Sequence, residues 1–139
     1  MQRKWRRAWK RTAMAAMFVA AATGQGQAMP QGGQVSSGTG AISQTGNTMT
    51  VNQATDKLSV NWQSFNIAHN EHVNFTQPSA SAVALNRVVG NDSSSIYGQL
   101  TANGKVFLIN PNGILFAPGS QVNVGGIVAS TLNMSDKDF

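Results

Sequence analysis

The chain has 139 residues, no cysteine and a formal net charge of +5. Six of its ten basic residues lie in the first eleven positions, and residues 29–139 carry four basic and five acidic residues, a net charge of −1. This distribution excludes nucleic acid as a partner of residues 29–139, because binding to phosphates requires a basic surface, and the lack of cysteine excludes the disulfides that stabilise many small exported domains.

The first 28 residues have the three parts of a cleavable secretory signal peptide. A basic start precedes the apolar run 13–22 (AMAAMFVAAA), and a small-x-small site follows at residues 26–28 (GQA). Ten helical residues span about 15 Å, too short for a bilayer core of about 30 Å. We therefore predict that residues 1–28 are a signal peptide and that the Sec translocase exports the chain. Signal peptidase is expected to cut after Ala28, with Ala22 as the alternative site.

Residues 29–47 are rich in Gly, Ser and Gln, and they predict a loose leader that enters a first strand near Ile42. From Thr48 onward, apolar and polar residues alternate over short stretches bounded by Gly, Pro, Asn and Ser, which predicts strands buried on one face. Val83 and Leu85, for example, flank Ala84 as a candidate inward pair. Helical apolar stripes are absent after residue 28, so residues 29–139 are predicted to be all-β.

Strand centres every 8 to 12 residues or so suit either a sandwich of hairpins or a parallel β-helix. Short strands and turns rich in Asn and Gly favour the β-helix, since these residues tolerate left-handed backbone angles at corners. Amide residues beside the strands predict hydrogen-bonded ladders between stacked coils. They are Asn52, Asn61, Asn66, Asn74 and Asn123.

The strongest local signal is the turn at residues 110–113. Asn110 stands at the first position, Pro111 presets φ at the second, Asn112 follows, and Gly113 accepts a positive φ at the fourth. Apolar strands flank the turn on both sides. A structural corner is the minimal interpretation.

Candidate chemistry is sparse. His69 and His72 are three residues apart, whereas a metalloprotease zinc helix needs a spacing of four with Glu beside the first His. We expect no metal or cofactor there and interpret residues 69–72 as a solvated loop. The acids are scattered, without a pair suited to glycoside chemistry, so we do not expect an enzyme.

Six segments in order carry a family resemblance: residues 60–67 (VNWQSFNI), 73–79 (VNFTQPS), 85–88 (LNRV), 96–100 (IYGQL), 103–114 (NGKVFLINPNGI) and 122–132 (VNVGGIVASTL). Together they resemble the N-terminal secretion domain of two-partner-secretion exoproteins, the filamentous haemagglutinins and high-molecular-weight adhesins, also described as a haemagglutination activity domain. The resemblance runs from about Gly46 to Phe139.

The resemblance implies a right-handed parallel β-helix with an N-terminal cap and extra hairpins, here incomplete. It implies that the periplasmic POTRA domains of an outer-membrane β-barrel transporter recognise the domain while it is extended. The domain would then fold at the cell surface and nucleate a passenger that acts on a host cell or another target. The matching motif residues are Asn61, Trp62, Phe65, Asn66 and residues 110–113. We predict that Trp62 and Phe65 fill the core and that the turn supports secretion.

Some positions depart from the family pattern. Ala68 stands where Gly often follows Asn-Ile, and Ala117-Pro118 replaces a Gly-led pair. The family domain is roughly twice as long, so residues 48–139 are expected to be the N-terminal part of a truncated domain, marginal and prone to aggregate alone. The alternative functions are a stand-alone adhesive or carbohydrate-binding module and, less favoured, a fragment of a β-helical polysaccharide-degrading enzyme.

Overall fold

The computed structural model describes residues 29–133, 135 and 136, so the predicted signal peptide and its cleavage residue Ala28 lie outside the described residues. The described part is all-β, and no helix in it is long and apolar enough to cross a membrane. Its strands are β1 (Gln34–Ser37), β2 (Gly40–Thr45), β3 (Thr48–Gln53), β4 (Lys57–Trp62), β5 (His72–Thr76), β6 (Val83–Val88), β7 (Ser94–Ile96), β8 (Gln99–Ala102), β9 (Lys105–Ile109), β10 (Ile114–Phe116), β11 (Gln121–Asn123) and β12 (Gly126–Ser130).

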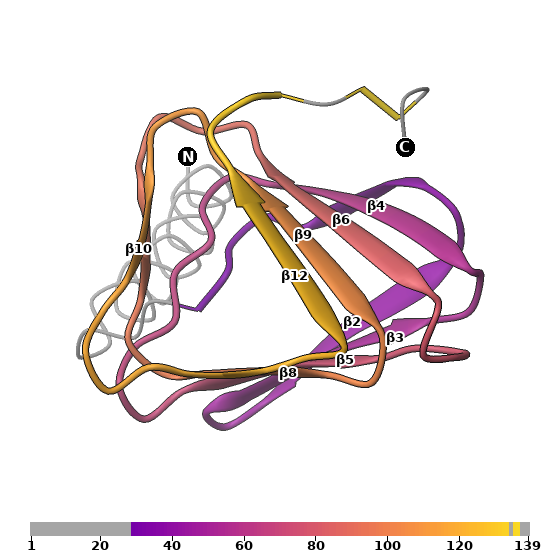
Figure 1. Cartoon of the computed structure of the whole chain (residues 1–139), viewed down its shortest axis with the longest axis horizontal. Helices are drawn as coiled ribbons and strands as arrows, with labels where there is room; N and C mark the ends of the chain where they lie inside the picture. The colour runs from indigo at the N-terminus through magenta and orange to yellow at the C-terminus, as the bar shows by residue number, and fades with distance from the viewer. Residues whose placement is uncertain (1–28, 134, 137–139) are drawn as a thin grey trace, which may run out of the picture.

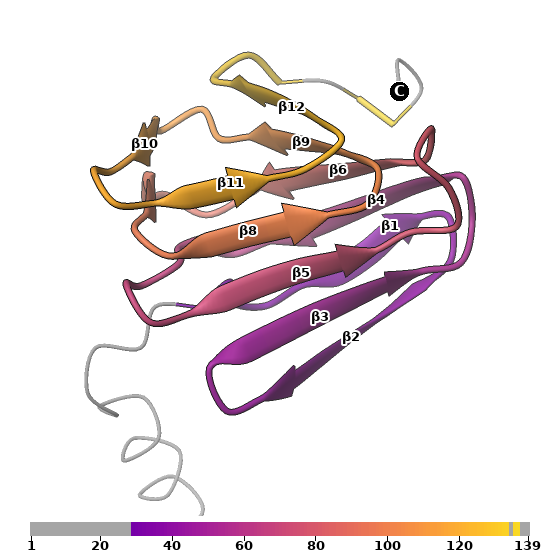
Figure 2. The same ribbon diagram turned by 60° about the horizontal axis from the view of Figure 1, so that its bottom comes forward.

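The strands form three sheets around one axis, and the cross-section is a triangle (Figure 1). The β6 sheet has the order β1-β4-β6-β9-β12, the β5 sheet has the order β11-β8-β5-β3-β2, and the β7 sheet pairs β10 with β7. The chain visits each sheet in turn and returns one level higher, as Figure 2 shows for β3, β5, β8 and β11. The fold is therefore a parallel β-helix of about 4 turns, and the sandwich is excluded.

Neighbouring coils stack in register, which gives each inward position a similar neighbour above and below it. Leu58 pairs with Ala84 and Ala84 pairs with Val106 along the β6 sheet. In the first coil the third side has no named strand, and an isolated parallel bridge joins Ile67 to Ile96 instead. Successive strands of one sheet run in the same direction, so the chain crosses the other two sides of the helix before it returns to that sheet.

The first end of the helix is closed by antiparallel strands. β1 pairs with β4, and β2 forms a hairpin with β3. Residues 29–47, expected as a loose leader, are thus largely ordered: backbone pairing begins at the bridge of Gln31 with Ser64, β1 precedes Ile42, and Met29 is part of the inner core. The composition of residues 29–47 predicted a loose segment because Gly-, Ser- and Gln-rich strands at the edge of a sheet bury little apolar surface of their own.

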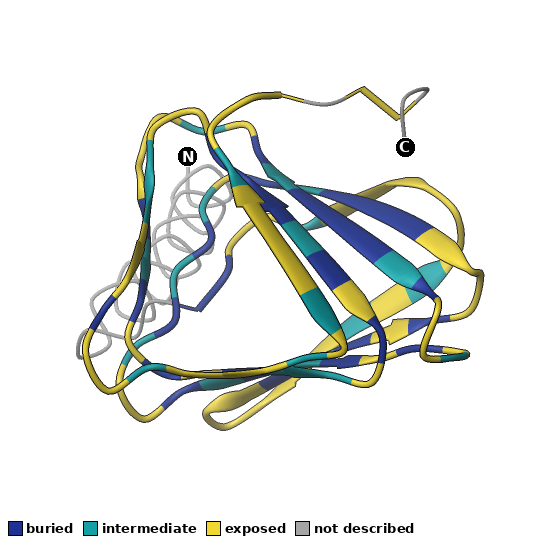
Figure 3. Cartoon of the chain, viewed as in Figure 1, coloured by how far each residue is buried: buried dark blue, intermediate teal, exposed yellow. Residues whose placement is uncertain are grey.

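The inner core is one cluster along the axis of the helix. Alternate residues of the central strands, such as β3 and β5, point into it and are buried, whereas β1, β2 and the strands of the last coil are mostly exposed (Figure 3). Its members larger than alanine are Met29, Met49, Val51, Leu58, Val60, Trp62, Phe65, Ile67, Val73, Phe75, Val88, Ile96, Leu100, Val106 and Leu108. Burial of these side chains is the main source of stability in a domain without disulfides.

The expected inward pair of β6 is wrong. In β6, Ala84 belongs to the inner cluster, whereas Leu85 is buried outside that cluster on the opposite face of the strand. Leu85 pairs laterally with Ser59 and Phe107. The predicted alternation is one residue out of register with the observed one. Because Ala84 is also apolar, the sequence pattern of β6 fits burial of either face. Leu132, the last residue of the family-like segment 122–132, lies outside any strand and is exposed.

Candidate recognition and nucleation site

Trp62 and Phe65 lie at the first end of the core, as predicted. Both are fully buried, and their rings meet edge to face at a centroid distance of 5.6 Å. The indole N–H of Trp62 donates a hydrogen bond of 2.9 Å to Oδ1 of Asn86, which is also buried. Gly33 of the cap lies against this ring, since a Cβ there would come within 2.5 Å of it. Trp62 thus joins the cap to the first coils.

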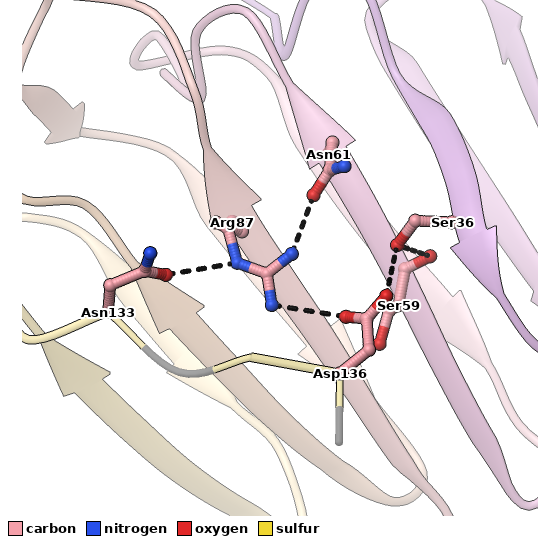
Figure 4. Close-up of polar contacts among 6 residues, drawn as sticks. All are labelled: Ser36, Ser59, Asn61, Arg87, Asn133 and Asp136. Carbon is pink, nitrogen blue, oxygen red and sulfur yellow. Dashed lines mark hydrogen bonds and ion pairs between the residues drawn. The ribbon is translucent and has the colours of Figure 1, made fainter. Parts of the chain in front are cut away.

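Asn61 lies on the opposite face of β4. Its Oδ1 accepts a hydrogen bond of 2.9 Å from Arg87, in the adjacent β6 (Figure 4). The same guanidinium donates to Asn133 and forms an ion pair of 3.1 Å with Asp136. Ser36 of β1 also donates to Asp136. The segment after β12 is therefore held across the outer face of the β6 sheet, next to the N-terminal cap.

The pKa of Asp136 should make this attachment sensitive to acid. Desolvation raises the pKa of Asp136, but hydrogen bonds from Arg87 and Ser36 and the charge of Arg87 outweigh it and lower the pKa below its ordinary value of 3.8. A lowered pKa stabilises the attached state at pH above 3.8, and this contribution is lost as the pH falls through the folded-state pKa. We expect amide hydrogen exchange in residues 131–136 to rise below about pH 4, relative to intrinsic rates, before the core opens. In Asp136→Asn the same segment should exchange fast at every pH; an unchanged profile would contradict the attachment.

Asn66 connects the first coil to the second. Its Oδ1 accepts a hydrogen bond of 2.8 Å from the backbone N–H of Ser95, beside the Ile67 to Ile96 bridge. The amide side chain therefore adds to the backbone pairing at this bridge, on a side where the first coil has no strand. This supports the structural part of the motif prediction, and its role in secretion stays a prediction.

The turn at residues 110–113 is present. The N–H of Gly113 donates to the carbonyl of Asn110 at 3.0 Å, and Gly113 has a φ of 112°. Asn110 is completely buried, and its Nδ2 donates to the carbonyl of Asp92 and to Oγ of Ser94.

Asn112 completes this turn. Its backbone N–H donates to Oδ1 of Asn110 at 2.9 Å, while its exposed amide reaches the carbonyl of Gly90. Pro111 is exposed beside it. The turn is therefore fixed to residues 90–94 of the preceding coil, so it aligns two coils as well as forming a corner.

The expected amide ladders are formed in a different way. Asn61, Asn66 and Asn74 contact the next coil through Arg87, the Ser95 N–H and Thr101. The direct amide contact between coils is instead Gln77 to Gln53, at 3.2 Å.

Gln77, which directly follows β5, is a structural residue that was not predicted from the sequence. Its Oε1 accepts the N–H of Gly104 at 2.7 Å, and its Nε2 donates to the carbonyl of Lys105 at 3.1 Å. Its backbone exchanges hydrogen bonds with the side chain of Asn103. A Gln before Pro in a turn was the available signal, but one sequence cannot show that it faces inward.

The interpretation of residues 69–72 as a solvated loop is corrected at Glu71, which is 1% exposed. The ring of His69 lies against Tyr97, and Nε2 of His72 is 2.7 Å from Oγ1 of Thr101. Within residues 29–133, 135 and 136 there is no group of three His, Cys, Asp or Glu side chains that could hold a metal ion.

The last coil leaves all three sheets open. Strands β10, β11 and β12 are edge strands, and large apolar side chains remain exposed on them. These side chains are Leu115, Phe116, Val122, Ile127 and Val128. Val122 pairs laterally with the buried Leu100, so its side chain points inward with no further coil among the described residues above it. An open edge of this kind can accept another parallel strand.

Comparison with known proteins identifies the family of this β-helix. The family model described as the TPS secretion domain matches residues 26–139. The chain belongs to the family of TPS (two-partner-secretion) secretion domains. A heme/hemopexin-binding protein of Haemophilus influenzae strain Rd is 46% identical over 106 residues, which cover 76% of this chain and 12% of that protein. A second H. influenzae protein of the same name is 47% identical over 90 residues, covering 65% of this chain and 10% of that protein.

The crystal structure of the HMW1 secretion domain from H. influenzae superposes with a TM-score of 0.75 at 39% identity, covering 78% of this chain and 29% of that one. This TPS secretion domain therefore spans about a tenth of the curated relatives and under a third of that solved chain. It is a secretion-targeting domain, similar in sequence to part of these two proteins and in fold to the HMW1 secretion domain, and TPS domains are served by a dedicated outer-membrane transporter.

Proposed function

We propose that the domain crosses the inner membrane through the Sec translocase, loses residues 1–28 to signal peptidase after Ala28, and passes the periplasm unfolded. POTRA domains of the transporter then bind it in extended form. Extended segments with alternating side chains add to the edge of a sheet, where backbone hydrogen bonds give affinity and the side chains give specificity. The lack of cysteine supports this route, because no disulfide can lock the chain before it crosses the outer membrane.

The observation that carries the second half of the proposal is the difference between the two ends of the helix. The first end is closed by antiparallel strands β1 and β2, whereas the last end presents three parallel edges with exposed apolar side chains. A helix closed at one end can grow only from the other. Folding that begins here at the cell surface would therefore order the following chain coil by coil.

The activity of the complete exoprotein would reside outside this domain. Similar domains occur in proteins named for binding heme and hemopexin and in HMW1. A part shared by proteins of different names is suited to targeting, and we propose that any contact with a host cell is made by the following passenger. The family match does not favour an enzyme or a stand-alone adhesive module.

The turn at residues 110–113 gives the test of this function. In the complete exoprotein expressed with its transporter, Asn110→Ala should reduce the secreted amount several-fold, because a buried amide that makes hydrogen bonds to the preceding coil is lost. Each lost buried bond costs about 1–3 kcal/mol where its partner stays unpaired. Immunoblots of medium and periplasm measure the ratio.

Asn52→Ala is the matched control, since Asn52 is exposed on β3. It should leave secretion unchanged. Equal secretion of both variants would show that Asn110 has no essential role in targeting or folding.

A further inference from the structure

Glu71 is a buried acid whose surroundings are incomplete. It is 1% exposed. Its Oε1 accepts two backbone hydrogen bonds, from the N–H of Met29 at 2.9 Å and from the N–H of Ala68 at 2.8 Å. Among the described residues, no donor lies within hydrogen-bond distance of Oε2.

A buried carboxylate in this position is costly without a positive partner. Two N–H groups offset part of the loss of hydration, but a buried charge normally needs an ion pair as well. The ion pair found among the described residues joins Arg87 to Asp136, on the outer face of the β6 sheet. The proposed targeting function assigns no role to Glu71.

Met29 is where a positive charge can arise. Its backbone nitrogen is already on Oε1 of Glu71, and its side chain is 1% exposed within the inner core. Residue 29 is also the first residue after the small-x-small site at residues 26–28. Peptide-bond hydrolysis between Ala28 and Met29 would turn this amide nitrogen into an α-amino group, which is protonated at neutral pH below its ordinary pKa of about 8.

We propose that the new α-ammonium group of Met29 forms a buried ion pair with Glu71, so that the domain reaches full stability only after its signal peptide is cut after Ala28. An ammonium has three donors where the amide has one, so it can reach both carboxylate oxygens. Glu71 thus makes folding depend on processing at one specific bond, because an additional residue would remove the charge and would have to leave a buried site. This inference rests on the cleavage after Ala28 given under the proposed function.

The experiment uses the full chain exported with its signal peptide and purified from the periplasm. Mass spectrometry reads the N-terminus, and circular dichroism reads the thermal midpoint. Two variants remove the pair: Glu71→Gln, which keeps the size of the side chain, and insertion of one Ser between Ala28 and Met29. Each should lower the midpoint by at least about 5 °C, since loss of one partner of a buried pair is strongly destabilising.

The combination of both variants tests whether Glu71 and the α-ammonium group of Met29 interact directly. It should lower the midpoint no further than the larger single effect, because both changes remove the same interaction. Asp56→Asn, the same chemical change at an exposed acid, is the matched control and should leave the midpoint unchanged. Fully additive losses, or a neutral Glu71→Gln, would overturn the proposal.

A second measurement does not require any variant to fold. Brief amine acetylation of the native chain should modify the exposed Lys105 and spare the α-amino group of Met29. Acetylation of both at similar rates would overturn the ion pair. An N-terminus other than Met29 would overturn the processing step and the ion pair with it, whereas loss of the pair with cleavage after Ala28 intact would leave the targeting function standing.

Discussion

Replacing Trp62 with alanine is expected to destabilise the domain by about 3–5 kcal/mol, a large part of the stability of a domain of this size. The indole fills the first end of the core, meets Phe65 edge to face and donates to the buried Asn86. Its loss would leave a cavity and would remove the donor to Oδ1 of Asn86. Urea unfolding followed by circular dichroism, on the secreted domain at low concentration, measures the change in the free energy of unfolding.

Two further variants separate packing from the hydrogen bond. Trp62→Phe keeps a ring but removes the donor to Asn86, and it should cost about 1–3 kcal/mol. Phe116→Ala is the control for an aromatic ring in the last coil, which is exposed and should change stability by about 0.5 kcal/mol or less. A stable Trp62→Ala domain would mean that the first end of the helix is not where the core is anchored.

Introducing a charge at the open end is expected to block growth of the helix. Val122→Lys places an ammonium at an inward position beside Leu100, where a following coil would bury it. An unpaired buried charge costs several kcal/mol, so the amount of protease-resistant passenger at the cell surface should fall at least about tenfold. The same substitution should reduce self-association of isolated residues 29–139, because inward charges protect sheet edges.

Val35→Lys is the matched control for this prediction. Val35 and Val122 are the same residue type with the same exposed fraction, 38%, at opposite ends of the helix. The substitution at Val35 should leave passenger folding near the unmodified level, since no further coil is added beyond β1. Equal effects of the two substitutions would contradict growth from the β10–β12 end. Isolated residues 29–139 that stay monomeric at high concentration would also contradict the expected aggregation.

The fold could be predicted in outline because period-two alternation and corner residues are local signals. They predicted short strands from Thr48 onward and the turn at residues 110–113. They failed where the local pattern is ambiguous. Ala84 and Leu85 are both apolar, so only contacts with neighbouring coils decide which of them faces inward.

The site was predicted less completely than the fold. Trp62 and Phe65 are buried as predicted, whereas the turn at Asn110 was predicted without its burial. Their partners Asn86 and Ser94 are 24 and 16 residues away, and such pairings depend on the register of the coils. Glu71 was assigned to a solvated loop because its burial depends on Met29, far away in the sequence.

The most direct test of the account is the dependence of export on the transporter. The gene product that contains residues 1–139 would be expressed with and without its two-partner transporter, and its location read by protease shaving of intact cells. We expect residues 29 onward outside the cell only when the transporter is present, and in the periplasm when it is absent. Equal amounts outside the cell in both cases would contradict a secretion-targeting role.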